Sequence, residues 1–108
     1  MRIAIIGGVE RTEPLLARLA KAAGHEVLFH RGAVGARGVR SLERVIDQAD
    51  LVIVVTDVNS HGAVRLARRF LRERGRVPVL LRRCGTARLA EMLDAIGTRR
   101  GQPRFHAA

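Results

Sequence analysis

The sequence predicts an α/β protein in which four parallel strands form one sheet and helices cover both of its faces. Four short β-branched runs alternate with four segments of helical periodicity. The strand segments are apolar at nearly every position, as in strands that are buried on both faces. Right-handed crossovers then give a three-layer sandwich with strand order 2-1-3-4, which is a flavodoxin-like or half-Rossmann architecture.

The first strand and the first helix follow from the opening residues. Residues 2–8 (RIAIIGG) form a β-branched run that ends in paired glycines. Thr12 is a suitable N-cap, and Pro14 is tolerated in the first turn of a helix. Gly24 is a typical helix stop. The apolar positions that recur at helical spacing in this segment are Leu15, Leu16, Leu19 and Ala23.

The second strand and the second helix are separated by a polar segment. Residues 25–30 (HEVLFH) are typical of a strand, and residues 31–39 are rich in glycine and arginine, which indicates a flexible loop. We expect Ser41 to cap a short helix that ends at Gln48. The side chains expected to face the core are Leu42, Val45 and Ile46.

The third strand has the strongest signal in the sequence. Residues 51–56 (LVIVVT) are too apolar to have a wet face, and residues 57–60 form a polar turn before a helix over 61–74. Residues 77–81 (VPVLL) form the fourth strand. Because Pro78 cannot donate a ladder hydrogen bond, this strand should lie at an edge of the sheet.

The last helix begins at Thr86, which we expect to act as its cap, and ends at Gly97. Its apolar face consists of Leu89, Met92, Leu93 and Ile96. Residues 98–108 (TRRGQPRFHAA) are basic, and we expect a flexible tail. The domain prediction is therefore one α/β domain over residues 1–97, followed by that tail.

The composition excludes several classes of protein. The chain has 108 residues, of which 47% are hydrophobic and only 3% aromatic, so it can bury one aliphatic core. A single cysteine excludes a disulfide scaffold. The longest apolar runs, at 3–9 and 51–56, are far shorter than the ~20 residues of a membrane span. We expect a cytoplasmic protein with no membrane partner and no secretory signal.

The net charge of +10 favours an anionic partner. Nineteen of the twenty basic residues are arginine, a bias that a GC-rich genome also produces. In the helix over 61–74, four arginines share one face by the i, i+3, i+4, i+7 rule. Arg65, Arg68, Arg69 and Arg72 could track phosphates, which predicts sequence-independent nucleic-acid binding as one hypothesis. A solvated face, or one that pairs with acidic residues of another subunit, is the alternative, because no aromatic residue interleaves with the arginines.

A ligand site is expected where the strand order reverses, beyond the carboxyl ends of the first and third strands. The turns at that point contain polar residues and paired glycines, and three helix N-termini, near Thr12, Ser60 and Thr86, are directed at the same edge. We expect an anionic ligand, such as a nucleotide or a phosphorylated metabolite. The residues predicted to bind it are Gly7, Gly8, Arg11, Thr56, Asp57, Asn59, Ser60, His61, Arg82 and Arg83.

The paired glycines do not form a dinucleotide fingerprint. Counted from Gly7, the later glycine positions of G-x-G-x-x-G are occupied by Val9 and Thr12, which argues against conventional NAD binding. The alternative is a tight strand-to-helix turn. Catalytic candidates are His61, Asp57 and Cys84, but no nucleophile, base and orienting group occur in a recognisable combination, so the sequence names no reaction.

Iron or haem binding is a second hypothesis. His61, at a helix start where the dipole favours a neutral ring, and Cys84, after two arginines and before a helix, are the main metal candidates, with His30 as a third. The two arginines before Cys84 and the helix start after it should both lower the pKa of the Cys84 thiol and make it reactive. The alternatives are an exposed histidine beside an Asx-type cap and a buried, inert cysteine.

Three segments together resemble the bacterial domain-of-unknown-function family 2325. They are Arg2–Gly8, Asp50–Val64 (DLVIVVTDVNSHGAV) and Leu80–Gly85 (LLRRCG). The most specific part is a T-D-x-x-S-H-x-A block, made here by Thr56, Asp57, Ser60, His61 and Ala63, and the likeness extends to about Gly97. The resemblance implies a small parallel α/β domain in the bacterial cytoplasm, with its ligand site in the turn after the third strand.

A homodimer is the predicted assembly. The chain is small, and an open four-stranded sheet leaves two unpaired edges. Burial of Phe29, or of the exposed rim of the fourth strand, across a two-fold axis would close such an edge.

Overall fold

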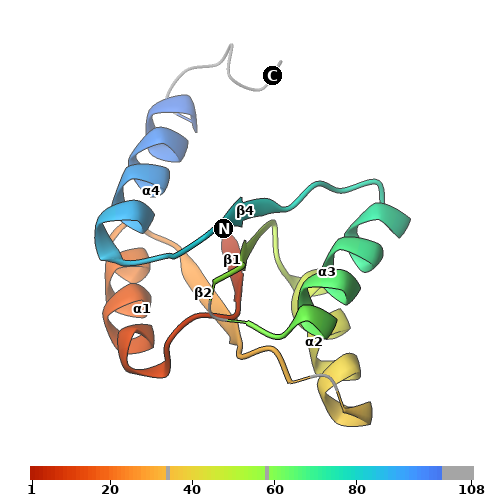
Figure 1. The fold of residues 1–108 in the computed structure, drawn as a ribbon. Helices are drawn as coiled ribbons and strands as arrows, with labels where there is room; N and C mark the ends of the chain where they lie inside the picture. Colours follow the sequence, from red (N-terminus) through yellow and green to blue (C-terminus); the bar gives the residue numbers. More distant parts are fainter. Residues whose placement is uncertain (34, 58, 101–108) are drawn as a thin grey trace.

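The computed structural model describes residues 1–33, 35–57 and 59–100, with the backbone alone for residues 97–100. Strands and helices alternate along the chain as the sequence predicts (Figure 1). None of the helices described is long and apolar enough to cross a bilayer. In chain order the elements are β1 (Arg2–Ile6), the 3-10 turn η1 (Glu10–Thr12), α1 (Glu13–Ala22), β2 (Glu26–His30), α2 (Ala36–Gln48), β3 (Leu51–Val55), α3 (His61–Glu73), β4 (Val79–Leu81) and α4 (Thr86–Arg100).

The four strands are parallel and lie in the order β2-β1-β3-β4, so the predicted fold class is confirmed. Strand β4 lies at an edge, and Pro78 directly precedes it, where its missing donor costs no ladder bond. Ile6 pairs with both His30 and Val54, and Val55 pairs with Leu81. The carboxyl ends of all four strands are therefore nearly flush, and the loops that follow them start from one edge.

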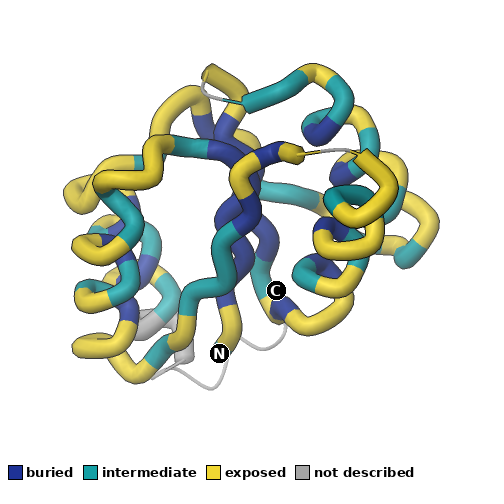
Figure 2. The backbone as a smooth tube through the Cα atoms, turned by 90° about the horizontal axis from the view of Figure 1, so that it is seen from below, coloured by how far each residue is buried: buried dark blue, intermediate teal, exposed yellow. Residues whose placement is uncertain are grey.

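The helices form two layers, with α1 and α4 on one face of the sheet and α2 and α3 on the other (Figure 1). Alternate residues of the central strands serve the two faces. Ile3, Ile5, Ile53 and Val55 pack with α1 and α4, whereas Ala4, Ile6, Val52 and Val54 pack with α2 and α3. Figure 2 shows the result: buried backbone runs through the centre, and exposed residues mark the outer sides of the helices.

Helix α2 begins earlier than predicted. It starts at Ala36, with Gly35 at its N-cap, so the prediction of a loop up to residue 39 and of a cap at Ser41 is wrong. Packing of Leu42 and Ile46 against the sheet outweighs the low helix propensity of Gly38, which costs about 1 kcal/mol. Gly38 also lets the chain approach itself closely, because a Cβ there would lie 2.2 Å from the Ala33 carbonyl oxygen.

Helix α1 starts near the predicted position, but only some of its regularly spaced apolar residues are buried. Leu15 is 47% exposed and Ala23 is also exposed, whereas Leu16 and Ala20 are the buried residues. The Thr12 side chain does not cap the helix, because its hydroxyl donates to the Val9 carbonyl oxygen, 2.7 Å away.

Helix α4 is longer than predicted. It begins at Thr86. The cap is Gly85 and not, as predicted, Thr86, because Leu89 N–H donates to the Gly85 carbonyl oxygen. It continues through Gly97 to Arg100, so the predicted end is wrong, because one glycine costs a helix only about 1 kcal/mol. The predicted tail consists of three helical residues and of residues 101–108, which lie outside the described residues.

Candidate ligand-binding site at the carboxyl edge of the sheet

A cavity of about 730 Å³ opens at the carboxyl edge, between the loops that follow β1, β3 and β4. Its volume lies in the range of small-molecule sites. The segments around Gly8 and His61, which the sequence assigned to one site, both contribute to its wall. The described residues that line it are Gly8, Val9, Thr12, Val55, Thr56, Asp57, Asn59, His61, Arg83, Cys84 and Gly85. We call this space the carboxyl-edge cavity.

Two consecutive glycines form the turn after β1. Gly7 and Gly8 have φ values of 92° and 95°, a conformation that residues with a side chain rarely adopt. Gly7 N–H extends the β1–β2 ladder by donating to the His30 carbonyl oxygen, and Gly7 does not line the cavity. A Cβ on Gly8 would meet no atom within 4 Å, so its backbone faces open space. Gly8 can therefore present its peptide groups directly to a ligand.

Asn59 links the ends of the two central strands. Its amide nitrogen donates to the carbonyl oxygens of Ile6, at 3.2 Å, and of Val55, at 2.9 Å. Its amide oxygen accepts from Ser60 N–H at 2.9 Å. Because both side-chain amide hydrogens are used within the protein, Asn59 forms part of the cavity wall and its side chain has no donor left for a ligand. We call these three bonds the Asn59 bridge.

Ser60 has a structural role as well. Its hydroxyl accepts from Ala63 N–H, which caps α3, and donates to the Gly32 carbonyl oxygen at 2.8 Å. Gly32 has a φ of 89°, and a Cβ there would lie 2.3 Å from the Asn59 amide oxygen. The loop after β2 is thus fastened to the start of α3. Ser60 does not line the cavity, whereas the exposed His61 beside it does.

Asp57 is placed next to two arginines by the strand pairing. Its N–H donates to the Arg82 carbonyl oxygen, which extends the β3–β4 ladder. The Asp57 carboxylate lies 3.6 Å from Arg82 Nε and 3.7 Å from Arg83 Nε. Both arginine side chains are largely exposed, so these ion pairs are weak and free to rearrange. Only Arg83 lines the cavity.

Cys84 lines the cavity but is not the activated thiol that its neighbours suggested. It is half-buried against the apolar cluster between the sheet, α1 and α4. Burial raises the pKa of the Cys84 thiol, and the nearby Arg88 opposes this rise only in part. Arg82 and Arg83 pair with Asp57 instead. The prediction of a lowered pKa is therefore wrong, because desolvation outweighs the local positive charge.

His30 is a structural residue rather than a metal ligand. It is buried, its Nε2 lies 3.0 Å from the Gly38 carbonyl oxygen, and its Nδ1 lies 3.1 Å from Gly32 N–H. Since a carbonyl can only accept, Nε2 carries the proton and Nδ1 accepts, so neither nitrogen is available to a metal. Across the part of the chain that the structure describes, no three His, Cys, Asp or Glu side chains are grouped as a metal site.

Arg11 lies outside the cavity, although the sequence placed it there. It is exposed on the 3-10 turn and borders a separate surface hollow with Glu10 and Pro14. The sequence reading missed Val9, Thr12, Val55 and Gly85 as lining residues. For Thr12 and Gly85 a signal existed, because each adjoins a helix start at the carboxyl edge. Val9 and Val55 have aliphatic side chains that carry no chemical signal for a ligand site.

A larger hollow, of about 940 Å³, lies at the opposite edge of the sheet and includes Arg2, Lys21 and Asp50. Parallel α/β sheets bind ligands at the carboxyl edge, where helix N-termini direct N–H groups outward. The amino edge meets helix C-termini, whose partial charge is negative. The smaller carboxyl-edge cavity is therefore the better candidate site.

Comparison with known proteins agrees with the sequence resemblance. Residues 2–96 match the family model described as "Uncharacterized protein conserved in bacteria (DUF2325)", and this range includes every residue that lines the cavity. The chain is also similar to the UPF0751 proteins of Desulfitobacterium hafniense strains DSM 10664 / DCB-2 and Y51. Each is 35% identical over 65 residues, which is 59% of this chain and 64% of the relative. The aligned part thus spans less than two thirds of those relatives.

Proposed function

The chain belongs to the DUF2325 family of bacterial proteins, and we propose that it is a small cytoplasmic, Rossmann-like binding protein for an anionic ligand. The ligand class is a nucleotide or a phosphorylated metabolite, bound in the carboxyl-edge cavity. The observation that carries this proposal is the convergence of Gly8, the first residue of α3, the start of α4 and Arg83 on one cavity of suitable volume.

The phosphate group would lie between the Gly8 turn and the two helix starts. The first N–H groups of a helix have no intrahelical acceptor, and the helix dipole favours an anion there. Ser60 occupies one N–H of α3, which leaves the others of that turn directed toward the edge. Arg83 can leave its long contact with Asp57 and form a paired hydrogen bond to a phosphate.

The uncharged part of the ligand would meet Thr56, Asp57 and His61. A carboxylate accepts hydrogen bonds from hydroxyl groups, so Asp57 suits a sugar or another polyol next to the phosphate. Its negative charge is balanced by Arg82 and Arg83, and the three side chains together carry a net charge of +1. An anion is therefore compatible with a carboxylate in the same cavity wall.

Ligand titrations with a matched pair of variants test this proposal. Inorganic phosphate, pyrophosphate, ADP and uncharged adenosine are added to the protein, and binding is followed by calorimetry and thermal unfolding. We expect ADP or pyrophosphate to bind and adenosine to bind much more weakly. Arg83→Gln should weaken phosphate-dependent binding about tenfold or more, since a charge-assisted bond contributes about 1.5–3 kcal/mol. Arg82→Gln is the control, because Arg82 also pairs with Asp57 but does not line the cavity.

Two results would contradict the proposal. One is the absence of binding by every phosphate-containing probe, together with no co-purified small molecule in native mass spectrometry. The other is equal weakening by the two arginine variants, which would indicate a general charge effect rather than contact in the cavity.

Iron or haem binding is the second candidate, because His61 and Cys84 line the same cavity. The raised pKa of Cys84 means that a metal would have to displace its proton. The absorption spectrum of freshly purified protein tests this candidate. A Soret band that disappears in His61→Ala would support haem binding, and added haemin whose spectrum stays that of free haemin in the presence of the protein would refute it.

Homodimer formation is part of the proposal. The exposed apolar residues near β4 are Val77 and Leu80, which are 84% and 45% exposed, whereas Phe29 on β2 packs partly against the core. The β4 edge is therefore the better dimer contact. Native mass spectrometry should give a dimer that Leu80→Lys converts to a monomer, and a monomeric wild-type protein would contradict this assembly.

A further inference from the structure

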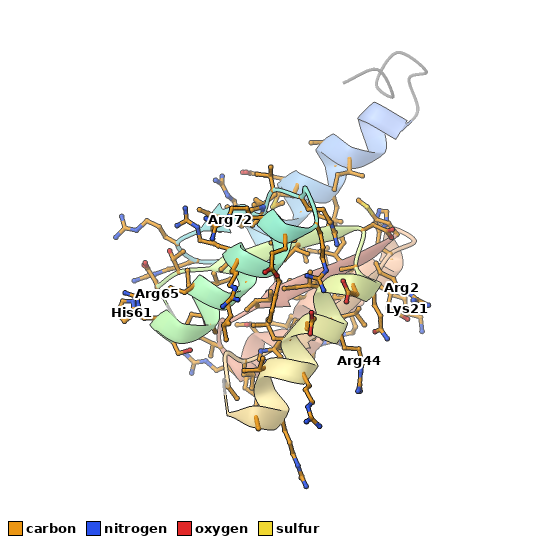
Figure 3. All side chains as sticks on the ribbon, turned by 90° about the vertical axis from the view of Figure 1, so that its right-hand side faces the viewer. Arg2, Lys21, Arg44, His61, Arg65 and Arg72 are labelled. Carbon is orange, nitrogen blue, oxygen red and sulfur yellow. The ribbon has the colours of Figure 1, made fainter. Side chains whose placement is uncertain are left out.

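The structure adds a second row of arginines to the one found in the sequence. Because α2 begins at Ala36, residues 37–44 are helical, and Arg37, Arg40 and Arg44 are exposed on its outer side. On the neighbouring helix α3, Arg65, Arg68, Arg69 and Arg72 are exposed as well. Figure 3 shows Arg44 projecting from α2 and Arg65 and Arg72 projecting from α3, on the side of the molecule that these two helices cover. We call this surface the α2–α3 face.

The acidic residues of the same two helices are already engaged. Arg74 binds Glu43, at 2.7 Å, and Asp47, so both carboxylates of α2 pair with a residue at the end of α3. Glu73 pairs with Arg69 at 3.5 Å. Within residues 1–33, 35–57 and 59–96, the other six arginines of the α2–α3 face have no acidic partner. The face is therefore strongly positive and not self-neutralised.

The spacing of the two rows suits a regular array of phosphates. Arg37 to Arg44, and Arg65 to Arg72, each span seven residues, or about 10 Å at a rise of about 1.5 Å per residue. Successive phosphates of one DNA strand advance about 3.4 Å along the duplex axis, so each row covers about three phosphates. The axes of packed helices lie about 8–10 Å apart, so the arginine rows of α2 and α3 can reach two separate stretches of the phosphate backbone.

The surroundings of the arginines favour duplex DNA over other polyanions. We propose that the α2–α3 face binds the phosphate backbone of double-stranded DNA without reading its sequence. An anionic membrane is disfavoured because the apolar sides of both helices are buried in the core, and, among the residues whose exposure is described, the exposed large apolar ones lie outside both helices, at Val9, Leu15, Val77 and Leu80.

The same reasoning disfavours single strands. Proteins bind single-stranded nucleic acids by stacking bases on aromatic side chains. The one aromatic residue of α2 and α3 is Phe70, which lies under the Arg74 guanidinium and packs against the core. The proposal does not depend on the carboxyl-edge cavity, because none of these arginines lines it.

Three charge-matched variants test the proposal on the intact protein. The α2 variant is Arg37→Gln/Arg40→Gln/Arg44→Gln, and the α3 variant is Arg65→Gln/Arg68→Gln/Arg72→Gln. The control, Arg18→Gln/Lys21→Gln/Arg88→Gln, removes the same charge from α1 and α4 on the opposite layer. Binding to a short fluorescent DNA duplex is measured by anisotropy between about 50 and about 200 mM salt. Circular dichroism and thermal unfolding verify that each variant is folded.

We expect the α2 and the α3 variant each to lose tenfold or more in affinity, and the control to stay within about threefold of the wild type. The log–log salt slope should become shallower by about 0.9 for each phosphate contact removed. Equal loss in the control would overturn the proposal, since net charge alone would then explain binding. It would also fail if only one row mattered, or if single-stranded DNA, an RNA duplex or phosphatidylserine vesicles bound more tightly than the DNA duplex.

Discussion

The Asn59 bridge gives the sharpest test of how the carboxyl edge is held together. Asn59 joins the ends of β1 and β3. Ile6, at the end of β1, lies 53 residues before it in the chain, and Val55, at the end of β3, lies four residues before it. Replacing Asn59 with alanine removes three hydrogen bonds and leaves the carbonyl oxygens of Ile6 and Val55 without this donor. At about 1 kcal/mol for each bond, we expect the free energy of unfolding to fall by about 3 kcal/mol. For a domain of this size, that corresponds to a decrease in Tm of roughly 12–24 °C.

The substitution Asn59→Asp separates the bridge from simple packing. The two side chains have nearly the same shape, but a carboxylate keeps the acceptor for Ser60 N–H and faces the two carbonyl oxygens without a hydrogen to donate. At neutral pH we therefore expect a larger loss than for Asn59→Ala. Contact with the carbonyl oxygens raises the pKa of the introduced carboxyl in the folded state, so part of the lost stability should return as the pH falls and the carboxyl gains a proton.

Chemical denaturation of ligand-free protein at several pH values is the appropriate assay, because it excludes any effect of a bound molecule. Ser60→Ala is the control, since it removes the cap of α3 and one bond to the Gly32 carbonyl oxygen but spares the bridge. That variant should lose about 1–2 kcal/mol at every pH. If Asn59→Asp is as stable as the wild type at neutral pH, the bridge does not hold the two strands as the structure indicates.

Three further predictions concern other positions. Gly32→Ala should destabilise the fold by clearly more than Gly24→Ala. Both glycines have a positive φ, but of the two only Gly32 is a position where the new methyl group would collide with a neighbour. Equal Tm values for the two variants would contradict this expectation. Burial raises the pKa of Cys84, so its reaction with a thiol reagent should be slow at neutral pH and should accelerate as the pH rises well above the pKa of a free thiol. A fast reaction whose rate reaches a plateau below neutral pH would refute the expected burial. Arg74 lowers the pKa of Asp47, so the stability that this pair contributes is present above the ordinary pKa of the carboxyl and is lost as the pH falls through the lowered pKa. Chemical denaturation should therefore show that Arg74→Gln destabilises the protein at neutral pH but much less in strong acid. A loss of stability that does not depend on pH would contradict the pairing.

The features that the sequence predicted well depend on hydrophobic pattern and topology. The runs that became β1 and β3 are apolar at every inward position of both faces, and a parallel sheet is the architecture that buries both. Pro78 assigned β4 to an edge for a local covalent reason. Once the strand order is known, the flush carboxyl edge and the meeting of the Gly8 and His61 loops follow from geometry.

The features that the sequence missed depend on partners that lie far apart in the chain. Residues 36–39 look like a loop because glycine and arginine are frequent there, and only packing against the sheet reveals the helix. Cys84 follows two arginines in sequence, but their side chains pair with Asp57, so burial decides its pKa. Asn59 has the composition of a ligand-binding residue, and its three internal bonds become visible only when the register of β1 and β3 is fixed.

The polar groups at the carboxyl edge therefore divide into two sets with different chemistry. His30, Asn59 and Ser60 use their donors and acceptors to hold the loops after β1, β2 and β3 in place. His61 and Arg83 line the carboxyl-edge cavity, between the loops after β1, β3 and β4, and Arg83 is held only by a long ion pair. A binding site needs both sets, because groups that contact a ligand are effective only when others fix their positions. Substitutions in the first set should therefore lower stability before affinity, and substitutions in the second should lower affinity with little change in stability.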